Sequence, residues 1–344
     1  MTSVAAAKKA TGAVTSPNAA IAIAPDSNLW IVGWMQSDDK PHTPLLARFL
    51  KNGTLDKTFN PPHGYQSLDM PGENDLVMHA STLHVGNHHV LVSANSQALW
   101  GPNHARVYRL GLAGEPGFGL RKWIEITHGT DEVFVASVIQ QNRAFLVAGT
   151  LVASTLKAGQ KQSRGFIARF HDDGTPDLSF GEQDAFRVYA SPFIDHNIAF
   201  NHLLQRPDGR LTAVGTLPNE RPRDTHAMVW QFKGDGTIDA SFNNGNPAVV
   251  TFNKYSNDEW LTATLHADGK LVVAGHASRW GLHLARYRTD GSLDNAFGEN
   301  GVVHLDRMSA RSMTLRPLSP TATLLAYNGL GPGGHLGLLA KFRN

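Results

Sequence analysis

The chain of 344 residues contains no cysteine. This absence excludes disulfide bonds, thiolate metal ligands and a cysteine nucleophile, and it leaves the redox compartment open. Charged residues make up only 17% of the chain, and 31 Lys and Arg against 29 Asp and Glu leave a formal net charge of +2. No field of one sign attracts a polyanion, so we expect neither nucleic-acid binding nor attraction to an anionic membrane.

Long apolar runs are also missing. No run approaches the roughly 20 residues that a membrane-spanning helix needs, so we expect no membrane insertion. The opening MTSVAAAKKATGAVTS lacks the continuous apolar core of a secretory signal. The sequence indicates a soluble chain, although a mature form with its signal removed would look identical. Nucleophile elbows and phosphate loops are absent too, so a nucleophilic mechanism has no visible anchor, and because the 17 histidines are scattered along the chain we expect no zinc site.

What the chain does contain is turns that repeat. It has 33 glycines and 18 prolines, which favours an all-β fold with many tight turns. LARFLKNGTLDKTF, IARFHDDGTPDLSF, VWQFKGDGTIDASF and LARYRTDGSLDNAF share one pattern, and the turn glycines recur about every 60 residues. A second turn, seen in PDGRLTAVG and ADGKLVVAG, precedes each of these. The sequence therefore predicts six copies of one structural unit.

Each unit is expected to form four short strands, because Asp-Gly or Asn-Gly between strand patterns indicates a hairpin. Four-stranded antiparallel units repeated radially make a β-propeller, so we predict an all-β, six-bladed β-propeller in a single domain. The sixth unit lacks a fourth strand, and TGAVTS at residues 11–16 can supply it as the outermost strand of the last blade. The predicted blades are approximately residues 17–70, 71–127, 128–190, 191–252, 253–305, and 306–344 plus 11–16.

The two turn motifs and their period resemble the bacterial delta-60 repeat. The best copies are residues 207–243 and 267–301, and the resemblance covers nearly the whole chain. It weakens in the second unit, where Gly117 stands in place of the aspartate. The resemblance implies a propeller fold and a secreted or cell-surface location. It implies no activity, because a fold does not determine a function.

The repeated turn is interpreted as structural. Gly291 supplies the turn, Asp294 bonds the turn backbone, and Phe297 fills the space between adjacent blades. An equivalent aspartate recurs at Asp56, Asp177 and Asp239, and we expect the arginines of the preceding strand to pair with these carboxylates. The exceptions are Gln231, which accompanies Asp239, and Arg109, which faces Gly117. Calcium-loop chemistry is a poor fit because TDGSLD lacks the downstream bidentate glutamate.

Function is therefore expected at the opposite end of the blades, where the loops vary in length and composition. Aromatic and histidine residues on or near that end are the candidate ligand-binding residues: Trp34, Trp100, Trp260, Trp280 and His283. Packing between blades is the alternative role for the tryptophans. Acidic residues precede the innermost strands of four blades and are the candidate metal ligands: Asp75, Asp131, Asp195 and Asp258. Capping of the inner strands is the alternative role for these carboxylates.

Two functions remain open. The favoured one is a non-catalytic binding protein that presents its variable loops to a glycan or protein partner. The alternative is a calcium-dependent hydrolase or lactonase, in which the four aspartates would hold one hard cation at the mouth of a central channel. The sequence names neither the ligand nor the oligomeric state.

Overall fold

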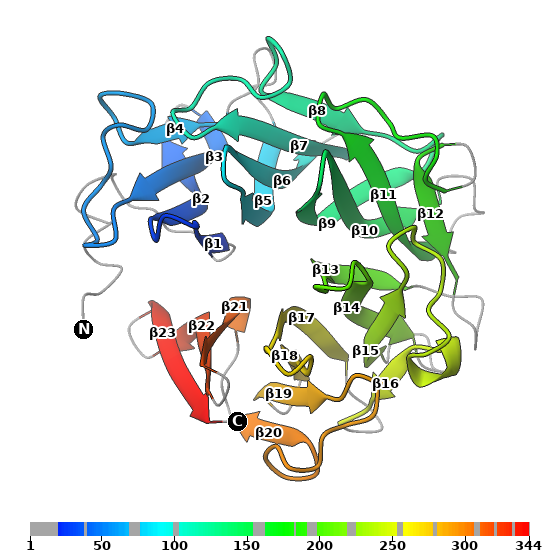
Figure 1. Cartoon of the computed structure of the whole chain (residues 1–344). Coiled ribbons are helices and arrows are strands. Elements are labelled where there is room, and N and C mark those ends of the chain that lie inside the picture. The colour runs from blue at the N-terminus through cyan, green and yellow to red at the C-terminus, as the bar shows by residue number, and fades with distance from the viewer. Residues whose placement is uncertain are drawn as a thin grey trace. The chain divides into compact units, whose positions relative to one another are not determined.

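The computed structural model describes residues 20–37, 40–68, 76–98, 103–153, 162–181, 184–190, 198–218, 225–252, 257–277, 281–305, 310–319, 322–331 and 334–343. Within these ranges the chain is almost entirely strand and turn, with one short 3-10 helix, η1 (Asn243–Gly245). The fold is a six-bladed β-propeller with antiparallel blades (Figure 1). The predicted fold class is confirmed.

Each blade is a meander in which every strand pairs with its neighbours in the sequence. The first three blades consist of β1 (Ala20–Ile23), β2 (Leu29–Ser37), β3 (Lys40–Phe49) and β4 (Tyr65–Ser67); β5 (Leu76–Val85), β6 (His89–Ala98), β7 (His104–Gly111) and β8 (Trp123–Ile126); and β9 (Glu132–Gln141), β10 (Ala144–Val152), β11 (Ser163–His171) and β12 (Phe186–Tyr189).

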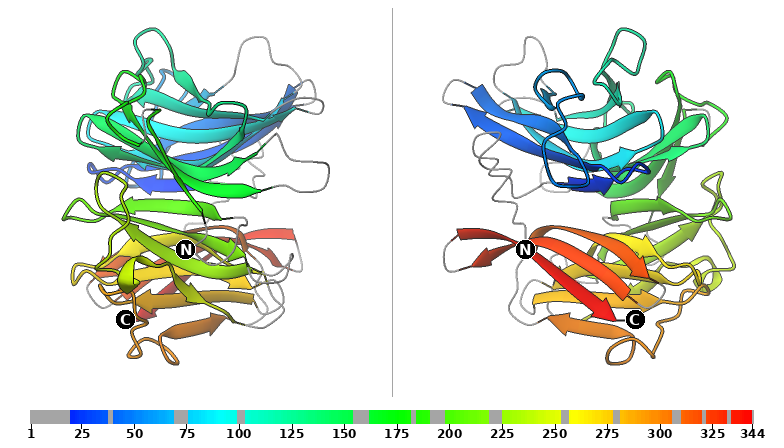
Figure 2. Two further views of the ribbon diagram at one scale, coloured as in Figure 1. Left: turned by 90° about the vertical axis from the view of Figure 1, so that its right-hand side faces the viewer. Right: turned by 60° about the vertical axis from the view of Figure 1, so that its left-hand side comes forward.

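The remaining blades follow the same order, as the green to red strands of Figure 2 show. They consist of β13 (Ala199–Gln205), β14 (Leu211–Pro218), β15 (Thr225–Phe232) and β16 (Ala248–Val250); β17 (Asp258–Leu265), β18 (Leu271–Ala277), β19 (Gly281–Tyr287) and β20 (Val302–Leu305); and β21 (Ala310–Ser319), β22 (Ala322–Gly331) and β23 (Gly334–Arg343). Among the described residues the sixth sheet has three strands. The predicted closing strand, residues 11–16, lies outside them.

The chain divides into two compact units, each described by itself below. The first comprises residues 1–147, 151–157 and 169–177, and the second comprises residues 148–150, 158–168 and 178–344. Blades one and two belong to the first unit, and blades four to six belong to the second.

The repeated turn joins the third and fourth strands of the first five blades, as predicted. The turn glycines have left-handed backbone conformations, with φ of +82° at Gly53, +88° at Gly174, +81° at Gly236 and +91° at Gly291. Three residues later the aspartate accepts a hydrogen bond from the backbone two residues on, as Asp239 does from the N–H of Ser241 at 3.0 Å. The motif is therefore a turn that is stabilised by its own side chain.

The phenylalanine at the end of each motif packs between blades. Phe297 is 1% exposed and lies in one cluster with Val272 of blade five and Leu315 of blade six. Phe59 likewise joins residues of blades one and two, among them Trp30, whose ring it meets edge-on at 4.8 Å. These contacts confirm the predicted role of the phenylalanine as filler between neighbouring blades.

Glycines on second strands allow a β-bulge in the inner strand. In blade five the register of β17 and β18 shifts between Trp260 and Thr262, opposite Gly275. A Cβ on Gly275 would lie 1.8 Å from the carbonyl oxygen of Glu259. Blade four repeats this arrangement with Gly215 opposite the shift that follows Phe200. Bulges re-aim the side chains of a strand, so this feature positions residues at the inner edge of the blade.

Side chains also join strands of neighbouring blades. The side-chain amide of Asn95 on β6 donates to the carbonyl of Val135 on β9, and its oxygen accepts from the N–H of the same residue, both at 2.8 Å. In blade four, Asn201 sits in the bulge and donates to the carbonyl of Trp260 at 2.9 Å. The asparagines supply hydrogen bonds that two separate sheets cannot form between their backbones.

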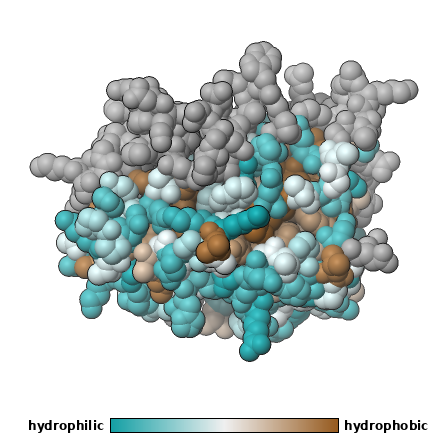
Figure 3. All heavy atoms as spheres, turned by 90° about the horizontal axis from the view of Figure 1, so that it is seen from above, coloured by the Kyte–Doolittle hydropathy of each residue, from teal (hydrophilic) through white to brown (hydrophobic). Residues whose placement is uncertain are grey.

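The described surface is largely polar on the side seen in Figure 3, where hydrophobic residues form isolated spots rather than one broad patch. Leu120 and Leu178 are 99% and 64% exposed. In the described part of the chain, no helix is long and apolar enough to cross a membrane.

Candidate functional site

The loop end of blades four and five is where the structure describes the most side chains on the variable side of the fold. In a four-stranded antiparallel meander, the first and third strands begin at the same end of the blade at which the second and fourth strands finish. The variable loops lie at this end. The starts of β15, β17 and β19 and the ends of β14, β16, β18 and β20 therefore share this end. Most of the variable loops themselves lie outside the described residues.

An aromatic ring forms the centre of this surface. Phe252 follows β16 and is partly exposed. Its ring stacks on the imidazole of His283, with centroids 4.1 Å apart and planes 13° apart, and meets Trp260 edge-on at 5.4 Å. The backbone N–H of Phe252 donates to Asp258 Oδ2 at 2.7 Å. We call Phe252, Asp258, Trp260, His283 and His304 the Phe252 cluster.

His304 on β20 brings an exposed imidazole to the cluster. Its Nδ1 lies 2.8 Å from Nδ1 of His283, and its ring is T-shaped to Phe252 at 6.0 Å. One of the two Nδ1 atoms must donate and the other must accept, so the hydrogen bond requires at least one neutral ring. The pairing fixes the orientation of both imidazoles and leaves His304 facing solvent.

Polar groups flank the cluster. Thr251, which precedes Phe252, is exposed, and its hydroxyl lies 2.5 Å from Nδ1 of His226. Glu259 follows Asp258 and forms an ion pair of 3.0 Å with Nε2 of His276, and the side chains of both residues are about 30% exposed. The exposed imidazole of His304 therefore lies beside a flat apolar ring, and a hydroxyl and a carboxylate stand on residues next to the cluster in the chain, which is a mixture typical of small-ligand sites.

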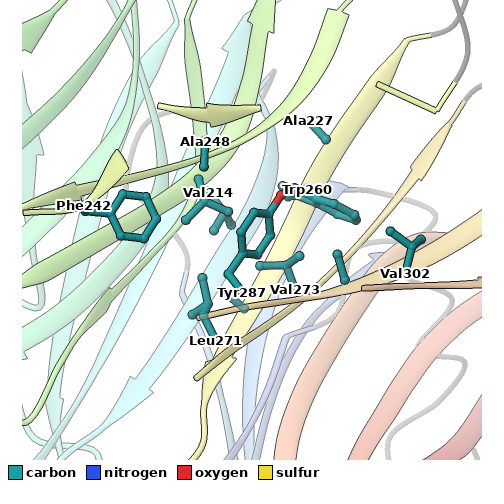
Figure 4. Packing of buried hydrophobic residues seen from close by; sticks show 12 residues of the cluster. Val214, Ala227, Phe242, Ala248, Trp260, Leu271, Val273, Tyr287 and Val302 are labelled. Atoms are coloured by element: carbon teal, nitrogen blue, oxygen red, sulfur yellow. Dashed lines mark hydrogen bonds between the residues drawn. The ribbon is translucent and has the colours of Figure 1, made fainter. Parts of the chain in front are cut away.

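Trp260 and His283 were predicted to contact a ligand, and the structure corrects this expectation. Trp260 is 0% exposed, and its indole N–H donates to the hydroxyl of Tyr287 at 3.3 Å inside the hydrophobic core (Figure 4). His283 is 2% exposed. Both residues are covered by neighbouring side chains, so they support Phe252 from within the fold instead of facing a ligand.

The structure describes little of the other three predicted aromatic residues. The backbone of Trp34 lies in β2, where it pairs with Pro44. Trp100 and Trp280 lie outside the described residues. Ligand contact by these three tryptophans stays a prediction.

Of the four predicted metal ligands, two lie within the described residues, and the convergence of the four stays a prediction. Asp75 and Asp195 fall outside them. Asp131 belongs to the first unit, where its Oδ2 lies 3.1 Å from Nδ1 of His128. Asp258 belongs to the second unit, is 0% exposed and accepts from the backbone of Phe252. No group of three His, Asp or Glu side chains placed to hold a metal ion occurs in the part of the chain that the structure describes.

Sequence reasoning missed Phe252, Thr251 and His304. His283 stood out because it lies near the variable loops. Phe252 gives no such signal, since it follows a fourth strand and has no motif around it. Its role depends on the residues of blade five that pack against it, which a linear pattern does not display.

Comparisons with known proteins agree on the fold. A family model described as a domain of unknown function (DUF5122) beta-propeller matches residues 266–297. A crystal structure of an unknown function protein from Dyadobacter fermentans superposes with a TM-score of 0.51 at 13% identity, covering 78% of this chain and 83% of that one. An α-L-arabinofuranosidase from Fusarium graminearum, a mutant with an iminosugar inhibitor, gives 0.53 at 11% identity, covering 95% and 92%. No curated protein matches the sequence.

These likenesses concern the fold alone, because the sequence identities are far below the level at which an activity is shared. The matching family is a β-propeller family, as the delta-60 resemblance implies, but its model covers only part of one repeat of this chain. The propeller fold is therefore established, and binding and enzymatic functions are both compatible with it.

Proposed function

We propose that the chain is a non-catalytic binding protein whose loop end binds a glycan, with Phe252 as the central contact. The observation that carries this proposal is the partly exposed ring of Phe252 stacked on the buried imidazole of His283 at 4.1 Å. The ring offers a flat apolar surface whose position is already fixed, so a ligand that packs on it loses little additional freedom of the protein.

A sugar ring matches this surface chemically. One face of a pyranose or furanose ring carries C–H groups that pack on an aromatic ring, and its edges carry hydroxyls that need hydrogen-bond partners. His304 supplies an exposed imidazole 6.0 Å from that ring, and Thr251, the preceding residue, supplies an exposed hydroxyl. The loops of other blades would extend the contact area, in keeping with the general use of variable loops on a rigid scaffold.

A glycan array probed with labelled wild-type protein tests the proposal. We expect a defined set of glycans to bind and Phe252→Ala to weaken their binding at least tenfold, which corresponds to about 1.4 kcal/mol. His304→Ala should weaken binding several-fold. Tyr65→Ala is the matched control, because it removes a partly exposed aromatic ring from the first unit, at the start of β4 on the turn end of blade one. That variant should bind like the wild type.

Other outcomes would contradict the proposal. A folded Phe252→Ala variant that binds the same glycans unchanged would place the site elsewhere. A wild-type protein that binds no glycan would favour a protein partner. Loss of binding on addition of EDTA, together with cleavage of the bound glycans, would favour the metal-dependent hydrolase.

A further inference from the structure

Blade two lacks the aspartate of the repeated turn, and its arginine pairs with a carboxylate of blade three. In blades three and five, Arg169 and Arg286 pair with the aspartate of their own turn at 2.7 and 2.8 Å. Gly117 stands in the place of that aspartate in blade two. There Nη1 of Arg109 donates to the carbonyl of Asp172 and, at 3.4 Å, to that of Gly117, while Nη2 lies 3.5 Å from Oδ1 of Asp172. Asp172 follows β11, so this pair joins two blades.

Two further side chains complete the contact between these blades. His89 is the first residue of β6, and Gln140 lies near the end of β9, the neighbouring strand of blade three (Figure 1). Nε2 of His89 lies 2.8 Å from Oε1 of Gln140, and Nε2 of Gln140 donates to Oδ1 of Asp172 at 3.0 Å. Nη2 of Arg109 lies 3.5 Å from Nδ1 of His89. We call His89, Arg109, Gln140 and Asp172 the His89 network, and all four belong to the first unit.

The network determines which nitrogen of His89 carries the hydrogen. Nε2 of Gln140 contacts two acceptors, Oδ1 of Asp172 and the carbonyl of Asn142 at 2.7 Å. This atom is therefore the amide nitrogen, and the oxygen of the same amide faces His89 as an acceptor. Nε2 of the neutral imidazole must donate to that oxygen, so Nδ1 presents its lone pair to the guanidinium of Arg109.

This arrangement opposes protonation of His89. A proton on Nδ1 would replace the lone pair by an N–H group that faces an N–H group of Arg109, with the two nitrogens 3.5 Å apart. Burial lowers the pKa of His89, and the positive charges of Arg109 and His88 contribute to the lowering. The hydrogen bond with Gln140 and the charge of Asp172 act in the opposite direction and do not reverse it.

We propose that the His89 network is an acid-sensitive latch between blades two and three, closed while His89 is neutral and open once its ring takes up a proton. Opening removes the acceptor that faces Arg109 and places two positive charges side by side. A base whose pKa is lowered in the fold stabilises the fold above its ordinary pKa, and this contribution is lost as the pH falls toward the lowered value. The inference does not rest on the proposed function, because it concerns the turn end of the blades.

The first test measures the pKa of His89 by NMR on the full chain with isotope-labelled histidine. The His89 resonance is assigned by its absence in His89→Gln. We expect a pKa below that of a free histidine in the wild type and a rise toward the free value in Arg109→Gln, because the opposing charge is removed. Arg169→Gln is the matched control, since Arg169 is the equivalent arginine of blade three and pairs with Asp177, and it should leave the pKa of His89 unchanged.

The second test measures the opening itself by hydrogen–deuterium exchange at pH 7 and pH 5, corrected for the pH dependence of the intrinsic exchange rate. Residues 86–91 and 171–174 carry or adjoin His89 and Asp172. We expect opening at these residues to become several-fold more frequent at pH 5, and the turn at residues 288–294 of blade five to stay unchanged. His89→Gln takes up no proton and should show no such increase.

Three results would overturn the proposal. A pKa of His89 equal to or above that of a free histidine would show that the fold accommodates the protonated ring, with Asp172 outweighing Arg109. An unchanged pKa in a folded Arg109→Gln variant would remove the guanidinium from the latch. Equal opening of the wild type at the two pH values would show that protonation does not release the contact. The two wild-type measurements decide the question even where a variant does not fold.

Discussion

At the scale of single residues, the repeated aspartate is held by several contacts at once. Asp294 is 3% exposed, and its Oδ2 lies 2.8 Å from Nε of Arg286 and 2.9 Å from Nζ of Lys270. Its Oδ1 accepts from the backbone of Ala296 at 3.3 Å. The carboxylate thus joins the third strand, the first turn and the second turn of blade five, which explains why the motif recurs in other blades.

These contacts make the stability of blade five depend on pH. The hydrogen bond from Lys270, the amide of Ala296 and the charge of Arg286 lower the pKa of Asp294 to about 2. A lowered pKa stabilises the fold above the unfolded value, near 4, and this contribution disappears as the pH falls toward 2. We expect wild type to exceed Asp294→Asn by about 2 kcal/mol in unfolding free energy at pH 6 and this difference to vanish near pH 2.

Denaturant unfolding at several pH values measures this difference. Asp268→Asn is the control, since Asp268 contacts the same Lys270 at 3.7 Å but its side chain is 51% exposed, and exposed pairs contribute little. A stability difference between wild type and Asp294→Asn that stays constant from pH 6 to pH 2 would contradict the account.

The pairings of the repeated motif could be predicted from the sequence, including the exceptions. Arg169 pairs with Asp177 at 2.7 Å and Arg48 with Asp56 at 3.2 Å, whereas Gln231 donates to Asp239 at 2.7 Å. These contacts are local, eight residues apart in the chain, so a repeated spacing reveals them. The packing of Phe252 and His304 on the candidates Asp258, Trp260 and His283 was not predicted, because it combines residues of blades four and five whose spacing occurs once.

At the scale of elements, the turn of one blade rests on the phenylalanine of the blade before it. A Cβ on Gly236 would lie 2.6 Å from Cζ of Phe180 and 2.9 Å from Cδ of Arg187. The hydroxyl of Tyr189 donates to the carbonyl of Gly236 at 2.6 Å. The glycine therefore serves two needs, a left-handed backbone and a close approach between blades three and four.

A matched pair of variants separates the effect of the left-handed backbone from the effect of the close approach between the blades. Gly209 has φ of +85°, close to the +81° of Gly236, but a Cβ there would meet nothing within 4 Å. We expect Gly209→Ala to cost about 1 kcal/mol from backbone strain alone. Gly236→Ala should cost about 1–3 kcal/mol more, because Phe180 and Arg187 must move. Equal losses of stability in urea unfolding would show that the contact between the blades does not constrain this turn.

Inner-strand bulges lie beyond what turn motifs predict. The sequence marks Gly275 as the end of a repeated second strand, but it does not show that the backbone of Glu259 approaches that glycine closely. The approach depends on how β17 is displaced against β18, and Asn201 of the previous blade contacts the displaced strand. Such contacts are set by the packing of two blades, so the residues of one blade do not reveal them.

At the scale of the whole molecule, six sequence repeats correspond to six sheets. The turn motifs and their period predicted the fold.

The predicted closure of the last blade by residues 11–16 is not tested by the described residues. If those residues form the outermost strand, deleting residues 1–19 exposes the edge of β23 and should lower the melting temperature and promote aggregation. Deleting residues 1–10 keeps the strand and should change neither property. Identical behaviour of the two deletions would contradict the closure.

The division of the blades into a structural turn end and a functional loop end is the central claim of this account. Hydrogen–deuterium exchange, measured with and without a glycan identified on the array, tests it most directly. We predict added protection in residues 225–227, 251–252 and 302–305, which carry or adjoin the Phe252 cluster, and none in the turns at residues 233–239 and 288–294. Protection confined to those turns would show that the ligand binds the repeated end and would contradict the claim.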